Sequence, residues 1–399
     1  MTYNRESRTI GILMKPNPGG QLAANEVVGR DLLIARLWQV LERQSLVLTA
    51  ERRMGKTSVI KKMTLQPLPD MLVKFRDLEG LRTPLEFVEA ILQDVQQDLS
   101  GKEQAMGGIR AWLKELSGVE IQGFKLPKSI EQHWKTILTK TIEDLMAQQE
   151  GMVVFFWDEM PMMLDNIKRD LGETVTMEIL TTLRSLRQTH LNLRMVFTGS
   201  IGLHHVVTQL KKVGAAGATT NDMHQEEVTP LDLADAVLLA QELLDGAKID
   251  VKDLARSIAE SVDLVPYYIH HIVDELQQIN SPITQTSVSD IILDNLYNPS
   301  NRWDMAHYRE RIDTYYESPI VPFTLGVLDE LAVTANPLPL PDLLQLLQVQ
   351  SNLQNLDREL LLKVLSLLQR DHYIGQQKGA YAFQFPLIQQ YWKLSRGLG

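Results

Sequence analysis

One segment, residues 45–58 (SLVLTAERRMGKTS), restricts the fold more than any other part of the chain. Its apolar run at 46–49 has the length and composition of a buried strand. A polar turn follows, and GKTS at 55–58 leads into a helical pattern at 59–63. This order of strand, loop and helix predicts a P-loop.

The chemistry of phosphate binding explains these residue types. Loop N–H groups and the helix N-terminus hold phosphates, Lys56 would reach the β- and γ-phosphates, and the Thr57 hydroxyl would bind Mg²⁺. The first glycine of GxxxxGK[ST] would fall at position 50, where this chain has Ala50. If that position needs a positive φ, alanine costs on the order of 1 kcal/mol. The alternative interpretation is a strand-turn-helix that carries GKTS by chance.

Composition narrows the class of protein. The 399 residues allow about two or three domains, and a formal net charge of −10 argues against a broadly basic nucleic-acid binder. Because the chain has no cysteine, disulfides, a thiolate zinc site and a cysteine nucleophile are excluded. No signal peptide and no apolar run of membrane-spanning length are found, so we expect a cytoplasmic protein.

A second informative segment is the apolar run MVVFFW at 152–157, which ends in Asp158 and Glu159. Such a run predicts a central strand of a parallel sheet, and ligands bind at the carboxyl ends of those strands. This is a Walker B pattern, in which Asp158 would hold Mg²⁺ through water and Glu159 would act as general base. The alternative is a strand that ends in a solvated acidic turn.

A further strand at 193–197 ends in Thr198, Gly199 and Ser200. Thr198 or Ser200 would contact the γ-phosphate or the attacking water; the alternative for both is ordinary turn chemistry. His204 and His205 follow, and because we expect adjacent side chains to point apart, they are a poor metal pair and are interpreted as surface or core residues.

The remaining patterns predict an α/β P-loop core at 27–229, with a parallel sheet and helices on both faces, after an irregular arm at 1–26. Strands are also expected at 71–78 and 225–228, a loop at 211–223, and helices at 32–43, 84–99, 130–149 and 173–189, with a short helix around Trp112 and an extended piece at 119–121.

Residues 230–297 read as a helical lid, 298–318 as a connecting helix and 319–399 as a winged-helix-like domain. Lid helices are expected at 231–245, 250–260, 266–279 and 284–296. The last domain is expected to have helices at 323–334, 341–349 and 357–370, before a hairpin around 375–379. Six basic and six acidic residues leave this domain neutral, which favours packing or protein contact over DNA binding.

Five motifs in order resemble the archaeal-type AAA ATPases, a group close to the STAND signal-transduction NTPases. The motifs are VGRD at 28–31, ERRMGKTS at 51–58, DE at 158–159, TGSIGL at 198–203 and VPYYI at 265–269. The resemblance covers about residues 25–395, including the winged-helix tail. It implies an AAA+ core that binds ATP with Mg²⁺ and hydrolyses it slowly, coupled to conformational change.

The resemblance also assigns site residues. Glu159 would be catalytic, Thr198 or Ser200 would fill the sensor position, and Thr57 and Asp158 would hold Mg²⁺. The residues expected to bind the nucleotide are Arg30, Ala50, Arg52, Arg53, Met54, Gly55, Lys56, Thr57, Ser58, Asp158, Pro266 and Tyr267. Arg184 and Arg187 are candidates for a finger acting on a neighbouring subunit, with a solvated helix face as the alternative.

The preferred function is an ATP-dependent conformational switch that signals through the winged-helix tail to a protein partner or within a homo-oligomer. One alternative is a DNA-binding ATPase of the initiator type, which the neutral tail disfavours. The other is a nucleotide-binding scaffold that does not hydrolyse ATP, which the Asp158–Glu159 pair disfavours.

Overall fold

The computed structural model describes residues 13–100, 112, 125–199, 202–212, 219–298, 303–350, 353 and 355–398. The chain divides into two compact units. One unit is Arg30–Thr229, and the other combines Met1–Gly29 with Pro230–Gly399. The expected helix around Trp112 and the extended piece at 119–121 lie, apart from Trp112 itself, outside the described residues. Among the described helices, none has the length and apolar character needed to cross a membrane.

A five-stranded parallel sheet forms the centre of the first unit, as the apolar runs predicted. Its order is β2-β3-β4-β1-β5, so β4 lies between the P-loop strand β1 and the Walker B strand β3. The strands are β1 (Ser45–Thr49), β2 (Met71–Asp77), β3 (Met152–Asp158), β4 (Leu193–Thr198) and β5 (Met223–Glu227).

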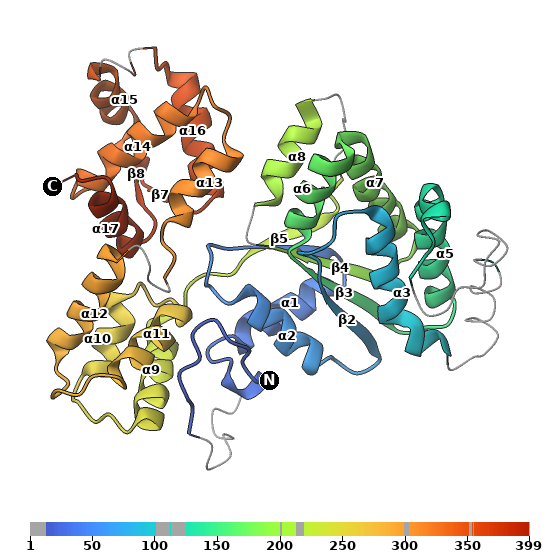
Figure 1. Cartoon of the computed structure of the whole chain (residues 1–399), viewed down its shortest axis with the longest axis horizontal. Coiled ribbons are helices and arrows are strands. Elements are labelled where there is room, and N and C mark those ends of the chain that lie inside the picture. Colours follow the sequence, from blue (N-terminus) through green and yellow to red (C-terminus); the bar gives the residue numbers. More distant parts are fainter. Residues whose placement is uncertain are drawn as a thin grey trace. The chain divides into compact units, whose positions relative to one another are not determined.

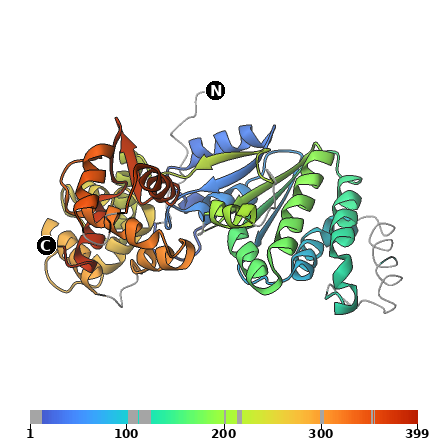
Figure 2. The ribbon, with the colours of Figure 1, turned by 90° about the horizontal axis from the view of Figure 1, so that it is seen from above.

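Both faces of this sheet are covered by helices (Figures 1 and 2). Alternate residues of β3 point to opposite faces: Phe156 packs in the cluster formed with α1 and α2, whereas Trp157 packs in the cluster formed with the other helices. The first face carries α1 (Asp31–Leu41) and α2 (Lys56–Leu65). The second carries α3 (Pro84–Ser100), α5 (Trp134–Met146), α6 (Met160–Leu171), α7 (Glu173–Thr189) and α8 (Leu203–Lys212). Burial on both sides explains why these strands are continuously apolar.

Two helices of this unit were not predicted. They are α6, which begins directly after the Walker B residues, and α8, which follows β4. The helix predicted at 130–149 begins instead as a 3₁₀ turn, η2 (Lys128–His133), and becomes α-helical only in α5.

The second unit begins with a helical bundle that also holds the N-terminal arm. Its helices are α9 (Leu233–Ala247), α10 (Leu254–Ser261), α11 (Pro266–Leu276) and α12 (Gln285–Tyr297), and the arm contains η1 (Ala24–Glu26). The Asn17 N–H donates to His270 Nδ1 at 3.2 Å. Burial lowers the pKa of His270 to about 4, so the imidazole is neutral and can accept this bond. The described part of the arm, from residue 13 onward, is therefore bonded to the bundle of this unit.

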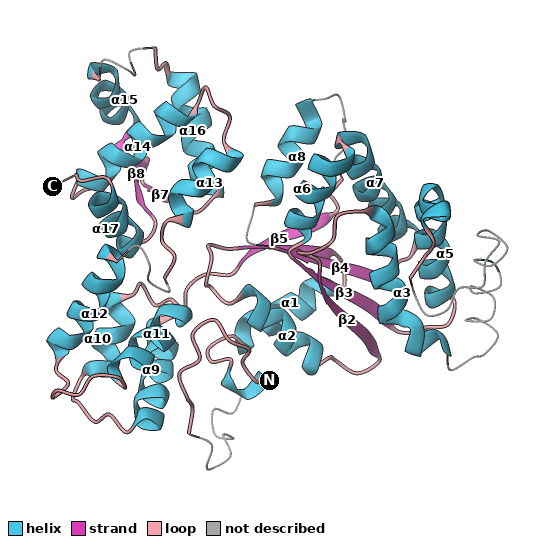
Figure 3. Cartoon of the chain, viewed as in Figure 1, coloured by secondary structure: helices cyan, strands magenta, loops and turns pink. Residues whose placement is uncertain are grey.

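The rest of the second unit contains mainly helices and a small antiparallel sheet (Figure 3). The sheet order is β6-β8-β7, and the hairpin turns at Lys378 (φ 51°) and Gly379 (φ 84°), as two-residue hairpin loops require. The elements are α13 (His307–Tyr315), α14 (Val321–Val333), β6 (Leu338–Pro339), α15 (Leu340–Val349), α16 (Arg358–Arg370), β7 (Ile374–Gln377), β8 (Ala380–Phe383) and α17 (Pro386–Ser395). The short strand β6 and the helix α17 were not predicted.

Buried hydrogen bonds join α13 and the residue after it to this small domain. Tyr316 Oη donates to Asp371 Oδ2 at 2.6 Å, and Tyr373 Oη donates to the Tyr308 carbonyl at 2.6 Å. Asp371 is 1% exposed, so its carboxylate is a buried acceptor.

Candidate functional site

The loop between β1 and α2 takes its shape from residues in the left-handed region. Gly55 is the N-cap of α2 with φ 88° and ψ 28°, and Arg53 has φ 72°. Ala50 is not among the positive-φ residues of the described chain. The backbone therefore does not require glycine at position 50, and alanine causes no left-handed strain there.

Lys56 is the first residue of α2, and its ammonium group turns back over the loop. Nζ donates to the Ala50 carbonyl at 2.9 Å and to the Glu51 carbonyl at 3.4 Å. The first turn of α2 has no acidic residue, so the positive end of the helix dipole is not neutralised by its own side chains. A lysine and a helix N-terminus at one loop are suited to binding phosphate.

The P-loop meets the Walker B strand through one short hydrogen bond. Thr57 Oγ1 donates to Asp158 Oδ2 at 2.6 Å, although the two residues are 101 positions apart. Asp158 is 4% exposed, and burial raises the pKa of its carboxyl above the ordinary value, opposed by the Thr57 hydrogen bond. A hydroxyl and a carboxylate in contact are hard oxygen ligands of the kind that Mg²⁺ prefers.

A third oxygen-bearing residue, Asp77, was missed in the sequence. It ends β2 and pairs in register with Asp158, and its charge contributes to the raised pKa of Asp158. The backbone after Asp77 is held against the end of β3, because the Leu78 N–H donates to the Asp158 carbonyl at 3.0 Å. The signal was available, because the strand predicted at 71–78 also carries a carboxylate at its end.

Glu159 has an unusual backbone conformation for its residue type. It is the N-cap of α6 with φ 54° and ψ 30°, and its N–H donates to Asp158 Oδ1 at 3.2 Å. Gly199, just past the end of β4, lies against it: a Cβ at Gly199 would be 3.3 Å from Glu159 Oε2 and 2.7 Å from Pro161 Cδ. Non-glycine residues with positive φ are concentrated at functional sites, where the surrounding structure holds them.

Of the two sensor candidates, only Thr198 lies in the described chain. It ends β4, pairs in register with Leu48 and is 2% exposed. Among the described residues, no partner accepts from or donates to its Oγ1. Ser200 lies outside the described residues, so its assignment stays a prediction.

The Arg30 guanidinium donates hydrogen bonds to two backbone carbonyls, one of which lies in the P-loop. Its Nη2 donates to the Met54 carbonyl and its Nη1 to the Thr229 carbonyl, both at 2.8 Å, and the side chain is 5% exposed. Arg52 and Arg53 are partly exposed on the loop, and the Arg52 N–H donates to Glu51 Oε1 at 2.8 Å. The buried Glu51 is a second residue of the site that the sequence reasoning did not single out.

The structure brings together the site residues of the first unit only. Pro266 and Tyr267 open α11, which belongs to the second unit. Their predicted contact with nucleotide stays a prediction. Ser58, in the first turn of α2, is partly buried.

Arg187 is a structural residue, so its assignment as a candidate finger was wrong. It is 7% exposed, its Nε donates to Asp222 Oδ2 at 2.8 Å, and its Nη2 donates to the Thr219 carbonyl at 2.9 Å. An arginine buried with its own carboxylate cannot extend to a neighbouring subunit. Arg184, on the same helix, is partly buried.

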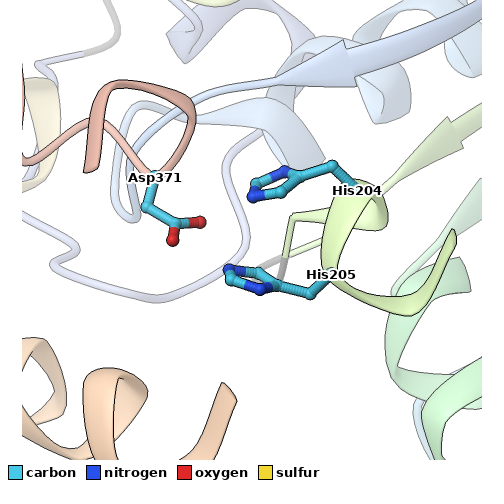
Figure 4. A group of neighbouring side chains, drawn as sticks. All are labelled: His204, His205 and Asp371. Carbon is cyan, nitrogen blue, oxygen red and sulfur yellow. The ribbon is translucent and has the colours of Figure 1, made fainter. Parts of the chain in front are cut away.

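The histidine pair of α8 also differs from the expectation. The rings of His204 and His205 extend in the same direction (Figure 4), with centroids 4.3 Å apart. The expectation that adjacent side chains point apart was therefore wrong here. Asp371, drawn in the same figure, belongs to the second unit, where it accepts the Tyr316 hydrogen bond described above.

A parallel sheet with a lysine-bearing loop after β1 and an acidic pair after β3 is the arrangement typical of P-loop nucleoside triphosphatases. Residues 40–207 match the family model of the AAA domain. None of the curated proteins matches the chain significantly.

Solved structures show the same fold across almost the whole chain. The Walker-type ATPase PABY2304 of Pyrococcus abyssi is 15% identical with a TM-score of 0.64, and the match covers 96% of this chain and all of that one. The ORC2 protein of Aeropyrum pernix is 9% identical with a TM-score of 0.52, and the match covers 92% of each chain.

Proposed function

We propose that this protein binds ATP with Mg²⁺, hydrolyses it slowly, and uses the nucleotide state as a conformational switch. The observation that carries the proposal is the Thr57–Asp158 hydrogen bond beside Lys56, because it joins the two phosphate-facing motifs in one place. The fold neighbours are consistent with this, since one is a Walker-type ATPase and the other was solved with ADPNP and ADP.

Each residue has a distinct role in this proposal. Lys56 and the N–H groups at the start of α2 bind the β- and γ-phosphates, while Thr57 and Asp158 hold Mg²⁺, with Asp77 available beside Asp158. When bound, Mg²⁺ neutralises the charge that develops on the phosphates. Glu159 orients the attacking water and accepts its proton, and Thr198 or Ser200 contacts the γ-phosphate.

We also propose that the C-terminal part is a winged-helix domain through which the protein signals to a protein partner. Support comes from three helices, α14 to α16, followed by the β7–β8 hairpin. Its basic residues include three with acidic neighbours: Arg358 with Glu359, Lys363 with Glu317, and Arg396 with Asp329. Paired charges release few counterions, so this surface suits a protein better than DNA.

Nucleotide binding is tested by titrating ATP into the purified chain with and without Mg²⁺. The Lys56→Ala variant should lose ATP binding, because the Lys56 ammonium is the group proposed to bind the β- and γ-phosphates. Lys61→Ala is the matched control: it lies on the same helix, and its ammonium lies over the Phe75 ring at 5.4 Å from the ring centroid. Equal ATP affinity in Lys56→Ala and Lys61→Ala would refute the site.

Hydrolysis is tested with Glu159→Gln, which keeps the size of the side chain and removes its basicity. We expect unchanged ATP affinity and loss of phosphate release. Undiminished release would remove Glu159 from the catalytic role. If the unsubstituted protein binds ATP and releases no phosphate, the non-hydrolysing scaffold becomes the better description.

DNA binding is tested by titrating duplex DNA at low salt with and without ATP. We expect no binding. Affinity that falls steeply as salt increases would favour the initiator-type ATPase, because counterion release is the signature of phosphate contacts.

A further inference from the structure

The chain passes between the two units at only two peptide links. One joins Gly29 to Arg30, and the other joins Thr229 to Pro230. On the P-loop side, Arg30 Nη1 donates to the Thr229 carbonyl at 2.8 Å, so both links leave this unit from one hydrogen-bonded pair. The two residues are 199 positions apart in the sequence.

The same guanidinium also holds the P-loop. Arg30 Nη2 donates to the carbonyl of Met54, which is 2% exposed and directly precedes Gly55. At the front of the loop, the Val228 N–H donates to the Thr49 carbonyl at 2.8 Å. One end of the P-loop is therefore bonded to Arg30, and the other end to Val228, which directly precedes Thr229.

On the other side, each link soon enters fixed structure of the second unit. Gly29 has φ 69°, and a Cβ there would be 2.6 Å from Asp235 Cβ in the first turn of α9. The Leu231 N–H donates to the Leu264 carbonyl at 3.2 Å. The two links between the units, at residues 29–30 and 229–231, are therefore short on both sides, and we call them together the two-strand hinge.

We propose that Arg30 is a positioning residue that couples the conformation of the P-loop to this two-strand hinge. The guanidinium is a planar fork, so its two N–H groups keep a fixed geometry. A shift of the Met54 carbonyl when phosphates enter the loop must therefore move Arg30, the Thr229 carbonyl, or both. Lysine lacks the fork and cannot hold both carbonyls in fixed geometry. The inference rests on the proposed ATP binding.

The absence of cysteine makes a direct test simple. Ser185→Cys on α7 and Ser261→Cys on α10 place one exposed label on each unit, for fluorescence energy transfer in the full chain. ATP affinity and the ATP-induced change in transfer efficiency are measured for the labelled chain and for Arg30→Met and Arg30→Lys. Arg36→Met is the matched control, an exposed arginine on α1 that pairs with Glu226.

We expect the unsubstituted and Arg36→Met chains to show the same ATP-induced change. Arg30→Met should raise the Kd for ATP about tenfold, the effect of losing one charge-assisted hydrogen bond, and should lose the change even at saturating ATP. Arg30→Lys should lose most of the change and remains informative if Arg30→Met does not fold. A merely structural role would alter thermal stability without altering the response at saturation.

The two failures can be told apart. No ATP binding by the unsubstituted chain would overturn the proposed function. ATP binding with no change in transfer efficiency, or with an unaltered change in both Arg30 variants, would overturn the role of Arg30 alone.

Discussion

Gly199→Ala is the most informative substitution near the catalytic residues, because its effect can be worked out from distances. The added Cβ would be 2.7 Å from Cδ and 3.1 Å from Cγ of Pro161, and 3.3 Å from Glu159 Oε2. Ordinary carbon contacts are about 3.5–4.0 Å, so the start of α6 and the end of β4 must move away from each other. The proline ring is rigid and cannot turn away.

Such overpacking costs about 1–3 kcal/mol. For a unit of this size, about 2–4 °C of Tm is lost per kcal/mol, so the melting temperature should fall by about 2–12 °C. Because a shift of a catalytic group by about 1 Å can cost about a hundredfold in rate, phosphate release at saturating ATP should fall more than tenfold. ATP affinity should change little, since Lys56 and Thr57 are not displaced.

The measurements are thermal unfolding by circular dichroism, ATP titration and phosphate release. Gly80→Ala is the control, because a Cβ at Gly80 meets no atom within 4 Å. It should leave Tm and turnover nearly unchanged. If Gly199→Ala behaved like Gly80→Ala, the packing of Gly199 against Glu159 and Pro161 would be refuted.

Three further predictions concern backbone strain and buried charge. Ala50 does not have a positive φ, so Ala50→Gly should lower the free energy of unfolding measured in urea by about 0.5–1 kcal/mol. Arg53 has a positive φ, so Arg53→Gly should raise that free energy by about the same amount. Changes of the opposite sign would contradict the loop geometry. Burial raises the pKa of Asp158, so the charged carboxylate is disfavoured in the folded protein. Asp158→Asn should therefore raise the Tm of the nucleotide-free protein. The same substitution should abolish Mg²⁺-dependent ATP binding. A lower Tm would count against this. Burial raises the pKa of Asp263, which accepts from the Leu387 N–H at 2.8 Å, to about 6. The folded protein therefore binds the proton of the Asp263 carboxyl more tightly than the unfolded chain does. The free energy of unfolding should fall by about 2–3 kcal/mol as pH rises from about 4 to 6. In unfolding curves measured across that range, Asp263→Asn should remove this pH dependence.

The core was predictable wherever one short segment determines the structure. The strands at β1, β3 and β4 are continuous apolar runs, and the polar residues that end them fall at one edge of the sheet because the strands are parallel. The helices α6 and α8 were missed because the residues just before them, Asp158–Glu159 and Thr198–Ser200, were interpreted only for their chemistry at the strand ends. The N-cap of α6 is Glu159, which has a left-handed backbone conformation. The helix and turn propensities of glutamate do not predict that conformation.

What the sequence could not indicate depends on contacts between distant residues. Nothing near Arg187 in sequence reveals that its partner is Asp222, which is 35 positions away. Likewise, Arg30 was placed among the nucleotide-binding residues from its motif alone. Its two carbonyl partners become apparent only when the fold brings residues 54 and 229 together.

The discontinuous composition of the second unit has a consequence for how the protein is made. Met14 and Asn17 pack against Gly246 and His270, which lie on the far side of the entire 30–229 unit in sequence. On the ribosome, at about 5–20 residues per second, the arm emerges roughly 12–50 s before the helices that receive it. The P-loop unit can therefore complete its fold during translation, while the arm waits for the bundle to be synthesised.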